Sequence, residues 1–154
     1  MEARNPEFDA YQTEDVMSVN HSYLTYTLTK ALSRYDQQYN IMPELEFELA
    51  TGRVKPDIVI CHKIRINWFN DIIRLTEPPL VAIEILSPRQ ALADLTDKFQ
   101  LYFPAGVLSV WVLIPAFREI HVVTPDYNTI SFQKTGLLKD PASGLELNLD
   151  EVFA

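Results

Sequence analysis

The chain has 154 residues, of which 47% are hydrophobic and 22% charged, so it holds enough apolar material for one buried core and is not a disordered chain. No apolar stretch reaches the ~18 residues of a membrane span, no signal peptide is recognisable, and the single cysteine, Cys61, excludes an intramolecular disulfide, so a cytoplasmic location is expected. The 21 acidic and 13 basic residues give a net charge of −8, which opposes nucleic-acid binding through a broadly basic surface.

The first predicted element is an amphipathic helix. Helical periodicity starts after Asp15 or Ser18, either of which can cap the first turn, and continues to about Tyr35. His21 lies near the first turns of this helix. A lone histidine with no partner nearby in sequence is typical of a surface or half-buried position, and a supporting role at a functional site is the alternative interpretation.

Two strands joined by a tight turn at residues 51–53 are predicted next. Residues 41–49 alternate between apolar and acidic side chains, which is typical of a half-buried strand with an acidic outer face. That exposed face is the simpler explanation for Glu46, although Glu46 is also a possible additional acid of a site. The returning strand, residues 54–61, carries Asp57 near its start, where the residue either caps a turn or serves a functional site.

The most apolar predicted strand spans residues 80–86, and Glu84 is its only charged residue. Burying an ionised carboxylate among aliphatic side chains is costly unless a cation or hydrogen bonds compensate it. Glu84 therefore indicates either a functional site or a structural pair with an arginine. A helix is predicted next, at residues 91–103, before a Pro-Ala-Gly stop.

Asp94, Lys98 and Tyr102 form a stripe at i, i+4 and i+8 on that helix. Asp94 and Lys98 at this spacing can be an ordinary surface ion pair, worth ~0.3–0.5 kcal/mol. Alternatively the stripe faces the sheet and brings Lys98 to Glu84. For Tyr102, packing is expected rather than reaction.

Further strands and a C-terminal strand and turn complete the predicted order, at residues 108–114, 119–123, 129–132 and 144–153. The pattern predicts an α/β fold in which a mixed central sheet is flanked by the N-terminal helix and the 91–103 helix. A single domain covering residues 1–154 is expected.

The two acids on neighbouring predicted strands suggest a shared counter-ion. Asp57 and Glu84 supply carboxylates, and the backbone carbonyl of Ile85 offers a third oxygen. Oxygen ligands are those that Mg²⁺, or Mn²⁺ in its place, prefers in proteins. The hypothesis is a metal site for phosphodiester hydrolysis, with Lys98 orienting water or offsetting developing charge.

Several short fragments follow one another along the chain in a fixed order: Pro56-Asp57, Glu84-Ile85-Leu86-Ser87-Pro88, Asp94, Lys98, Tyr102, Ala105-Gly106-Val107, Trp111, Gly144-Leu145-Glu146-Leu147 and Asp150-Glu151-Val152-Phe153. In this order and spacing the chain resembles the Uma-two family, which is grouped with restriction endonucleases in the PD-(D/E)XK nuclease superfamily. The resemblance covers nearly the whole chain and implies Asp57 and Glu84 as metal ligands. The general superfamily lysine, two positions after the second acid, is Leu86 here, and the family is similar in supplying a lysine from the next helix, where Lys98 matches.

The resemblance implies a restriction-endonuclease-like, Mg²⁺-dependent endonuclease that acts on DNA as a homodimer, with no organic cofactor. The acidic composition keeps a second interpretation open, in which a catalytically inactive nuclease fold serves as a binding or interaction module. A third interpretation, an antitoxin-like acidic partner of a basic protein, depends on charge alone.

Overall fold

The computed structural model describes residues 17–154, and a six-stranded mixed sheet forms its centre. The strands lie in the order β1 (Tyr39–Pro43), β4 (Ile58–His62), β6 (Val81–Ile85), β7 (Ser109–Ile114), β8 (Glu119–Val123) and β9 (Thr129–Gln133). Only β6 and β7 run parallel; the other neighbours are antiparallel. The predicted mixed sheet is therefore confirmed, and strands β6 to β9 match the predicted segments to within about one residue at each end.

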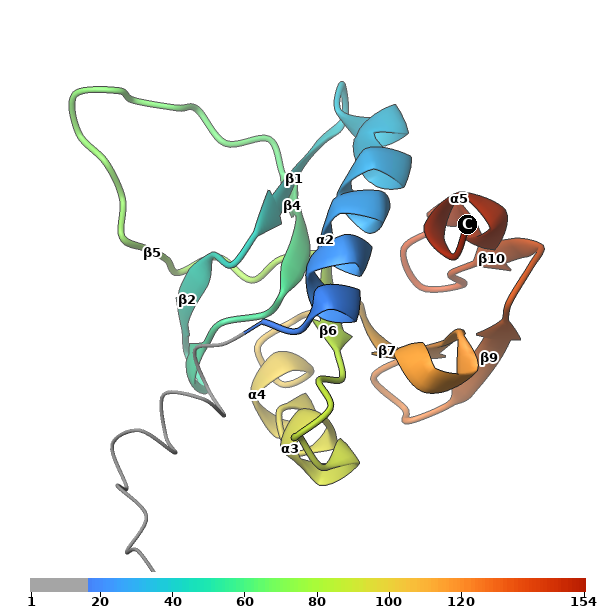
Figure 1. The fold of residues 1–154 in the computed structure, drawn as a ribbon. Helices are drawn as coiled ribbons and strands as arrows, with labels where there is room; N and C mark the ends of the chain where they lie inside the picture. Colours follow the sequence, from blue (N-terminus) through green and yellow to red (C-terminus); the bar gives the residue numbers. More distant parts are fainter. Residues whose placement is uncertain (1–16) are drawn as a thin grey trace, which may run out of the picture.

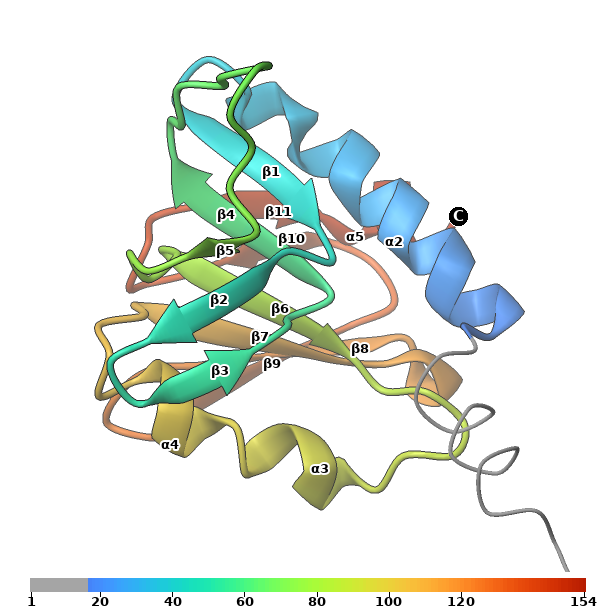
Figure 2. The same cartoon turned by 90° about the vertical axis from the view of Figure 1, so that its left-hand side faces the viewer.

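Helices cover both faces of this sheet (Figures 1 and 2). Helix α2 (Val19–Leu32) packs Leu24 and Leu28 against the face that carries Ile58 and Ile83. On the opposite face, α3 (Leu92–Thr96) and α4 (Phe99–Tyr102) cover alternate residues of the same strands, such as Val59 and Ala82. Because both faces are covered, β4 and β6 are buried along nearly their whole length.

The N-terminal helix begins as predicted, with Ser18 as its cap. The Ser18 hydroxyl accepts a hydrogen bond from the backbone amide of His21 at 3.2 Å, which satisfies one of the unpaired amides of the first turn. A 3₁₀ turn, η1 (Ser33–Tyr35), ends the helical segment at the predicted residue. Asp15, the other predicted cap, lies outside the described residues.

The prediction of one continuous strand over residues 41–49 is wrong. The chain leaves the central sheet after Pro43, at Glu44, whose backbone is left-handed with φ 52°, and then forms β2 (Glu46–Leu49). With β3 (Gly52–Val54) and the two-residue β5 (Arg74–Leu75), β2 makes a separate three-stranded sheet. The returning strand divides in the same way, because Pro56 cannot donate to a ladder and separates β3 from β4.

The predicted 91–103 helix is divided at Asp97 and Lys98. The amide of Lys98 donates to the carbonyl of Leu95 at 3.1 Å, three residues back, so the helix tightens here before α4 begins. Leu95 and Phe99 on either side of the break remain buried. The break therefore leaves Lys98 at the rim of the face that packs on the sheet. None of the helices in residues 17–154 has the length and apolar content needed to cross a membrane.

The C-terminal segment is joined to strand β7 of the central sheet by hydrogen bonds to one buried acid, Asp140. Strand β10 (Leu137–Lys139), which the sequence pattern did not predict, pairs with β11 (Glu146–Asn148), and α5 (Leu149–Val152) follows. Between the two strands Asp140 is only 2% exposed. Its carboxylate accepts hydrogen bonds from the hydroxyl of Ser109 and, at 2.8 Å, from the indole of Trp111, both on β7.

Replacing Asp140 with alanine is expected to destabilise the protein by about 3 kcal/mol, because Trp111 and Ser109 would each keep a buried donor without a partner. Urea unfolding followed by circular dichroism measures the change. Asp36→Ala, at an exposed position, is the matched control and should stay within about 0.5 kcal/mol of the parent chain. Equal midpoints for the two variants would contradict a structural role for Asp140.

Candidate active site

Asp57 and Glu84 come from neighbouring antiparallel strands. In the ladder of β4 and β6, Ile58 pairs with Ile83, and the same register continued by one residue sets Asp57 opposite Glu84. Both side chains lie on the face covered by α3 and α4, since their alternate neighbours Val59 and Ala82 belong to that core. The structure therefore places the two predicted acids together at one end of the strand pair.

Glu84 is almost completely buried, with 1% of its surface exposed, and three donor contacts surround it. The ammonium of Lys98 lies 3.3 Å from each carboxylate oxygen. The hydroxyl of Tyr102 donates to Oε1 at 2.5 Å. The partner is thus a lysine, and the alternative of a structural arginine pair for Glu84 does not describe this site.

These contacts do not fully compensate the buried charge. Burial raises the pKa of Glu84 from its ordinary value near 4.5 to about 7, and the negative charge of Asp57 adds to the rise, while Lys98 and Tyr102 oppose it. Between these two pH values the folded protein keeps a proton that the unfolded chain releases. The free energy of unfolding contributed by Glu84 therefore falls as the pH rises through that window.

Asp57 has two distinct partners. Its Oδ2 accepts a hydrogen bond from the backbone amide of Ile85 at 2.7 Å, and its Oδ1 lies 3.1 Å from Nε2 of His21. The hydrogen bond to Asp57 raises the pKa of His21 above its ordinary value of 6.5, against the lowering effect of burial. His21 is 7% exposed, so the structure does not place it on the surface. Its Nδ1 is buried without a hydrogen-bond partner among the described residues.

The three residues of the predicted stripe on the 91–103 segment have two different roles in the structure. Lys98 and Tyr102 reach Glu84. Asp94 is exposed and accepts the amide of Ala91 at 2.9 Å, so it caps the start of α3. Tyr102 is fully buried as expected, but its hydroxyl is also a site contact; burial and the adjacent Glu84 strongly raise its pKa and keep it a neutral donor.

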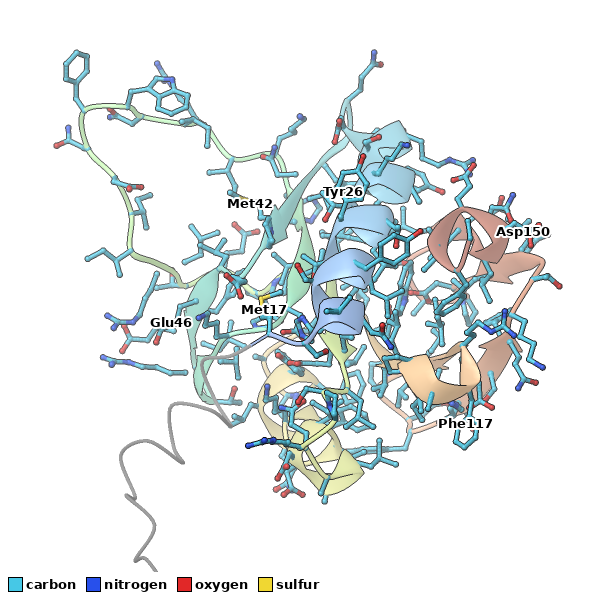
Figure 3. The ribbon with its side chains drawn as sticks, viewed as in Figure 1. Met17, Tyr26, Met42, Glu46, Phe117 and Asp150 are labelled. Carbon is cyan, nitrogen blue, oxygen red and sulfur yellow. The ribbon has the colours of Figure 1, made fainter. Side chains whose placement is uncertain are left out.

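Glu46 lies apart from these residues. It projects from β2 in the three-stranded sheet (Figure 3), and its Oε1 lies 3.2 Å from Nε of Arg74, without the geometry of a hydrogen bond. Glu48 on the same strand is exposed and lies near Arg53 at 3.7 Å. The acidic outer face predicted for this strand explains both glutamates, and the structure does not bring Glu46 to Asp57 and Glu84.

Asp57 and Glu84 form an open set of oxygen donors, which suits a hard divalent cation that keeps water among its ligands and differs from a closed protein cage. In residues 17–154, no three His, Cys, Asp or Glu side chains are grouped so that they could hold a metal by themselves. Mg²⁺ is commonly held by only one or two carboxylates, with water and substrate phosphate completing its shell. Asp57 and Glu84 supply two adjacent carboxylates, and because burial raises the pKa of Glu84, a cation bound beside the pair would favour its ionised form.

The backbone of Ile85 also fits this set. Its amide donates to Asp57, and in a β-strand the amide and carbonyl of one residue point to the same side. The next amide, that of Leu86, donates to the other side, to the carbonyl of Leu113 on β7. The carbonyl of Ile85 is therefore directed to the side of the strand where Asp57 lies.

Comparison with known proteins agrees with this architecture. The model of the Uma2 family, described as "Putative restriction endonuclease", matches residues 12–150. A crystal structure described as "a putative nuclease belonging to DUF820" from Anabaena variabilis ATCC 29413 aligns with a TM-score of 0.76 at 22% identity, covering 90% of this chain and 82% of that one. No curated protein matches the sequence. The family resemblance and the restriction-endonuclease-like fold predicted from the sequence are confirmed.

Proposed function

The chain belongs to the Uma2 family, and we propose that it is a divalent-metal-dependent endonuclease that hydrolyses phosphodiester bonds of DNA. The observation that carries this proposal is the pairing of Asp57 with a buried Glu84 whose charge Lys98 only partly compensates. The descriptions of the family and of the similar crystal structure support nuclease activity in general. The metal, Mg²⁺ or Mn²⁺, and the substrate, DNA, are further parts of this proposal.

In this proposal, Mg²⁺ or Mn²⁺ is held by the carboxylates of Asp57 and Glu84 and the carbonyl of Ile85. When bound, such an ion polarises the phosphate and lowers the pKa of a water molecule. The hydrogen bond from the Ile85 amide keeps one oxygen of Asp57 in a fixed orientation. Glu84 must be ionised to serve as a ligand, so metal binding displaces its proton and becomes tighter as the pH rises through about 7.

Three other side chains have distinct proposed roles. Lys98 places positive charge beside Glu84, where it orients the attacking water and stabilises charge that develops on the phosphate. Tyr102 positions Glu84 through its hydroxyl. His21 holds Asp57 from α2, and its raised pKa favours the protonated form that neutralises part of the acid pair.

The net charge of −8 favours one competing function. Double-stranded DNA is usually bound through many lysine and arginine contacts, which release counter-ions from the phosphates. An acidic chain that retains the fold without turnover would serve as a binding or interaction module. The two functions differ in whether the acid pair binds metal and whether the chain cleaves nucleic acid.

Conversion of supercoiled plasmid to nicked and linear forms tests the proposal. Cleavage is expected with Mg²⁺ or Mn²⁺ and not with EDTA, and either ion should raise the melting temperature, because a ligand bound only by the folded state stabilises it. No cleavage with either ion, together with an unchanged melting temperature, would overturn the nuclease proposal in favour of the binding module. Cleavage that persists in EDTA would contradict the metal dependence.

A further inference from the structure

Residues 63–73, which connect β4 to β5, project from the body of the protein (Figure 1). This segment, here called the 63–73 loop, exposes five large apolar side chains: Ile66 50%, Trp68 90%, Phe69 99%, Ile72 56% and Ile73 76%. Single exposed apolar residues are normal on a protein surface, but a contiguous group of this size marks an interaction site. Since the loop leaves β4 at the end opposite Asp57, it lies about one strand length away from the candidate active site.

The tip of the loop is held in place by its own hydrogen bonds. The side-chain carbonyl of Asn67 accepts hydrogen bonds from the backbone amides of Phe69, at 3.1 Å, and Asn70, at 3.2 Å. At the base of the loop, the amide of Ile64 donates to the side chain of Asn40 on β1 at 2.7 Å. The two aromatic side chains are therefore presented by an ordered turn, which lowers the entropy cost of binding.

Beside the tip, the same loop encloses an apolar hollow of about 130 Å³. Six apolar side chains form most of its wall, and four polar ones complete the lining: Met42, Leu45, Ile64, Ile66, Ile72 and Leu75, with Arg65, Asn67, Asn70 and Asp71. An apolar protein cavity of about 150 Å³ accommodates a benzene molecule, so this hollow has nearly the size of one phenyl ring. Neither Trp68 nor Phe69 lines it. The loop thus carries an exposed phenyl ring and, separately, a hollow of matching size and chemistry.

We propose that the 63–73 loop is a two-fold symmetric contact between two copies of this chain, in which Phe69 of each copy enters the hollow of the other. A ring and its receptor on one surface make that surface self-complementary, which is the requirement of a two-fold interface. Trp68 packs beside the inserted ring and closes the contact.

The exposed area is consistent with a second copy as the occupant. Trp68 and Phe69 are almost fully exposed and together offer roughly 400 Å² of aromatic surface, to which three isoleucines add. A standard protein interface buries about 800 Å² on each partner, so the loop supplies its apolar centre. A nucleic acid fits this surface less well, because the isoleucines cannot stack on bases and the one cation at the hollow, Arg65, is offset by Asp71 in the same lining.

Sedimentation of the full chain over a wide concentration range tests this contact. The parent chain is expected to form a dimer, and Phe69→Ala should raise the dimer dissociation constant roughly 30-fold or more, as for a central interface residue. Ile72→Asp, which places a charge in the wall of the hollow and leaves the tip unchanged, should weaken the dimer similarly. Phe117→Ala is the matched control, because Phe117 is 60% exposed and lies on the other side of the molecule from Met42 and the loop (Figure 3).

Tryptophan emission gives a second measure. Trp111 is fully buried within the single chain, so a blue shift with rising concentration reports the burial of Trp68. A chain that stays monomeric at all concentrations, or a dimer that Phe69→Ala and Phe117→Ala affect equally, would overturn the proposal. So would a monomer whose Trp68 emission is quenched by an oligonucleotide in EDTA, a result that would assign the loop to nucleic acid. None of these outcomes depends on nuclease activity.

Discussion

Glu84→Gln is expected to remove plasmid cleavage and the metal-induced rise in melting temperature while leaving the fold intact. Glutamine preserves the shape of the buried side chain and still accepts the hydroxyl of Tyr102, but it lacks the charge that binds a cation. Because a catalytic metal contributes several kcal/mol to transition-state stabilisation, the cleavage rate should fall roughly 10³-fold. Glu48→Gln, at an exposed surface pair with Arg53, should change neither measurement.

Glu84→Gln also tests whether Glu84 is charged or neutral in the metal-free protein. Ionising Glu84 against a pKa of about 7, when its ordinary value is 4.5, costs the folded protein roughly 3 kcal/mol once the pH exceeds 7. Glutamine has no such cost. The unfolding free energy of Glu84→Gln minus that of the parent should therefore increase by roughly this amount between pH 4.5 and pH 8.

Urea titrations in EDTA at several pH values give this difference directly. His21 also titrates in this range, but it is present in both proteins and its contribution largely cancels in the subtraction. A difference that does not change with pH would show that Glu84 is already ionised without metal. A metal-independent loss of stability at every pH would assign Glu84 to a structural ion pair with Lys98 instead.

The sequence pattern alone identifies Glu84 as a candidate site residue, because burying one acid in an otherwise apolar strand costs free energy unless a partner compensates it. It also predicts the placement of Lys98, since the positions of Leu95 and Phe99 set which side of the helical segment is buried. Both inferences use local periodicity. For this reason strands β6 to β9 and the N-terminal helix are predictable to within a few residues.

Long-range pairings leave no comparable signal. His21 and Asp57 belong to different elements, and no periodicity relates a helix position to a strand entry. The departure of the chain from the central sheet depends on a left-handed Glu44, a conformation for which glycine or asparagine would have been the recognisable residue. Asp140 lies among proline, serine and glycine, a composition typical of a solvated turn, yet it is buried against Trp111.

Lys98→Met is expected to separate metal binding from cleavage. Methionine has a similar length and can occupy the apolar rim beside Leu95 and Phe99, so the fold should be kept. The acids that bind the metal remain. Cleavage should nevertheless fall roughly 10²–10³-fold, the usual cost of removing one group that stabilises developing charge.

The pH of this measurement matters, because Lys98 lowers the pKa of Glu84. Without the ammonium that pKa rises further, so the metal must be titrated well above pH 7, where Glu84 is ionised in both proteins. Under that condition the metal-induced rise in melting temperature should be nearly equal in the variant and the parent. Lys139→Met, at an exposed position on β10, is the control for loss of one lysine charge.

Two results would change the assignment of Lys98. Unchanged cleavage by Lys98→Met would reduce the lysine to a counter-charge for Glu84, with the 3.3 Å contacts contributing to stability alone. A loss of metal binding at high pH would instead mean that the ammonium organises the two carboxylates for the ion. Only retained binding with lost cleavage supports a role for Lys98 at the reacting phosphate, because that role requires a charge acting on the transition state rather than on the ligand set.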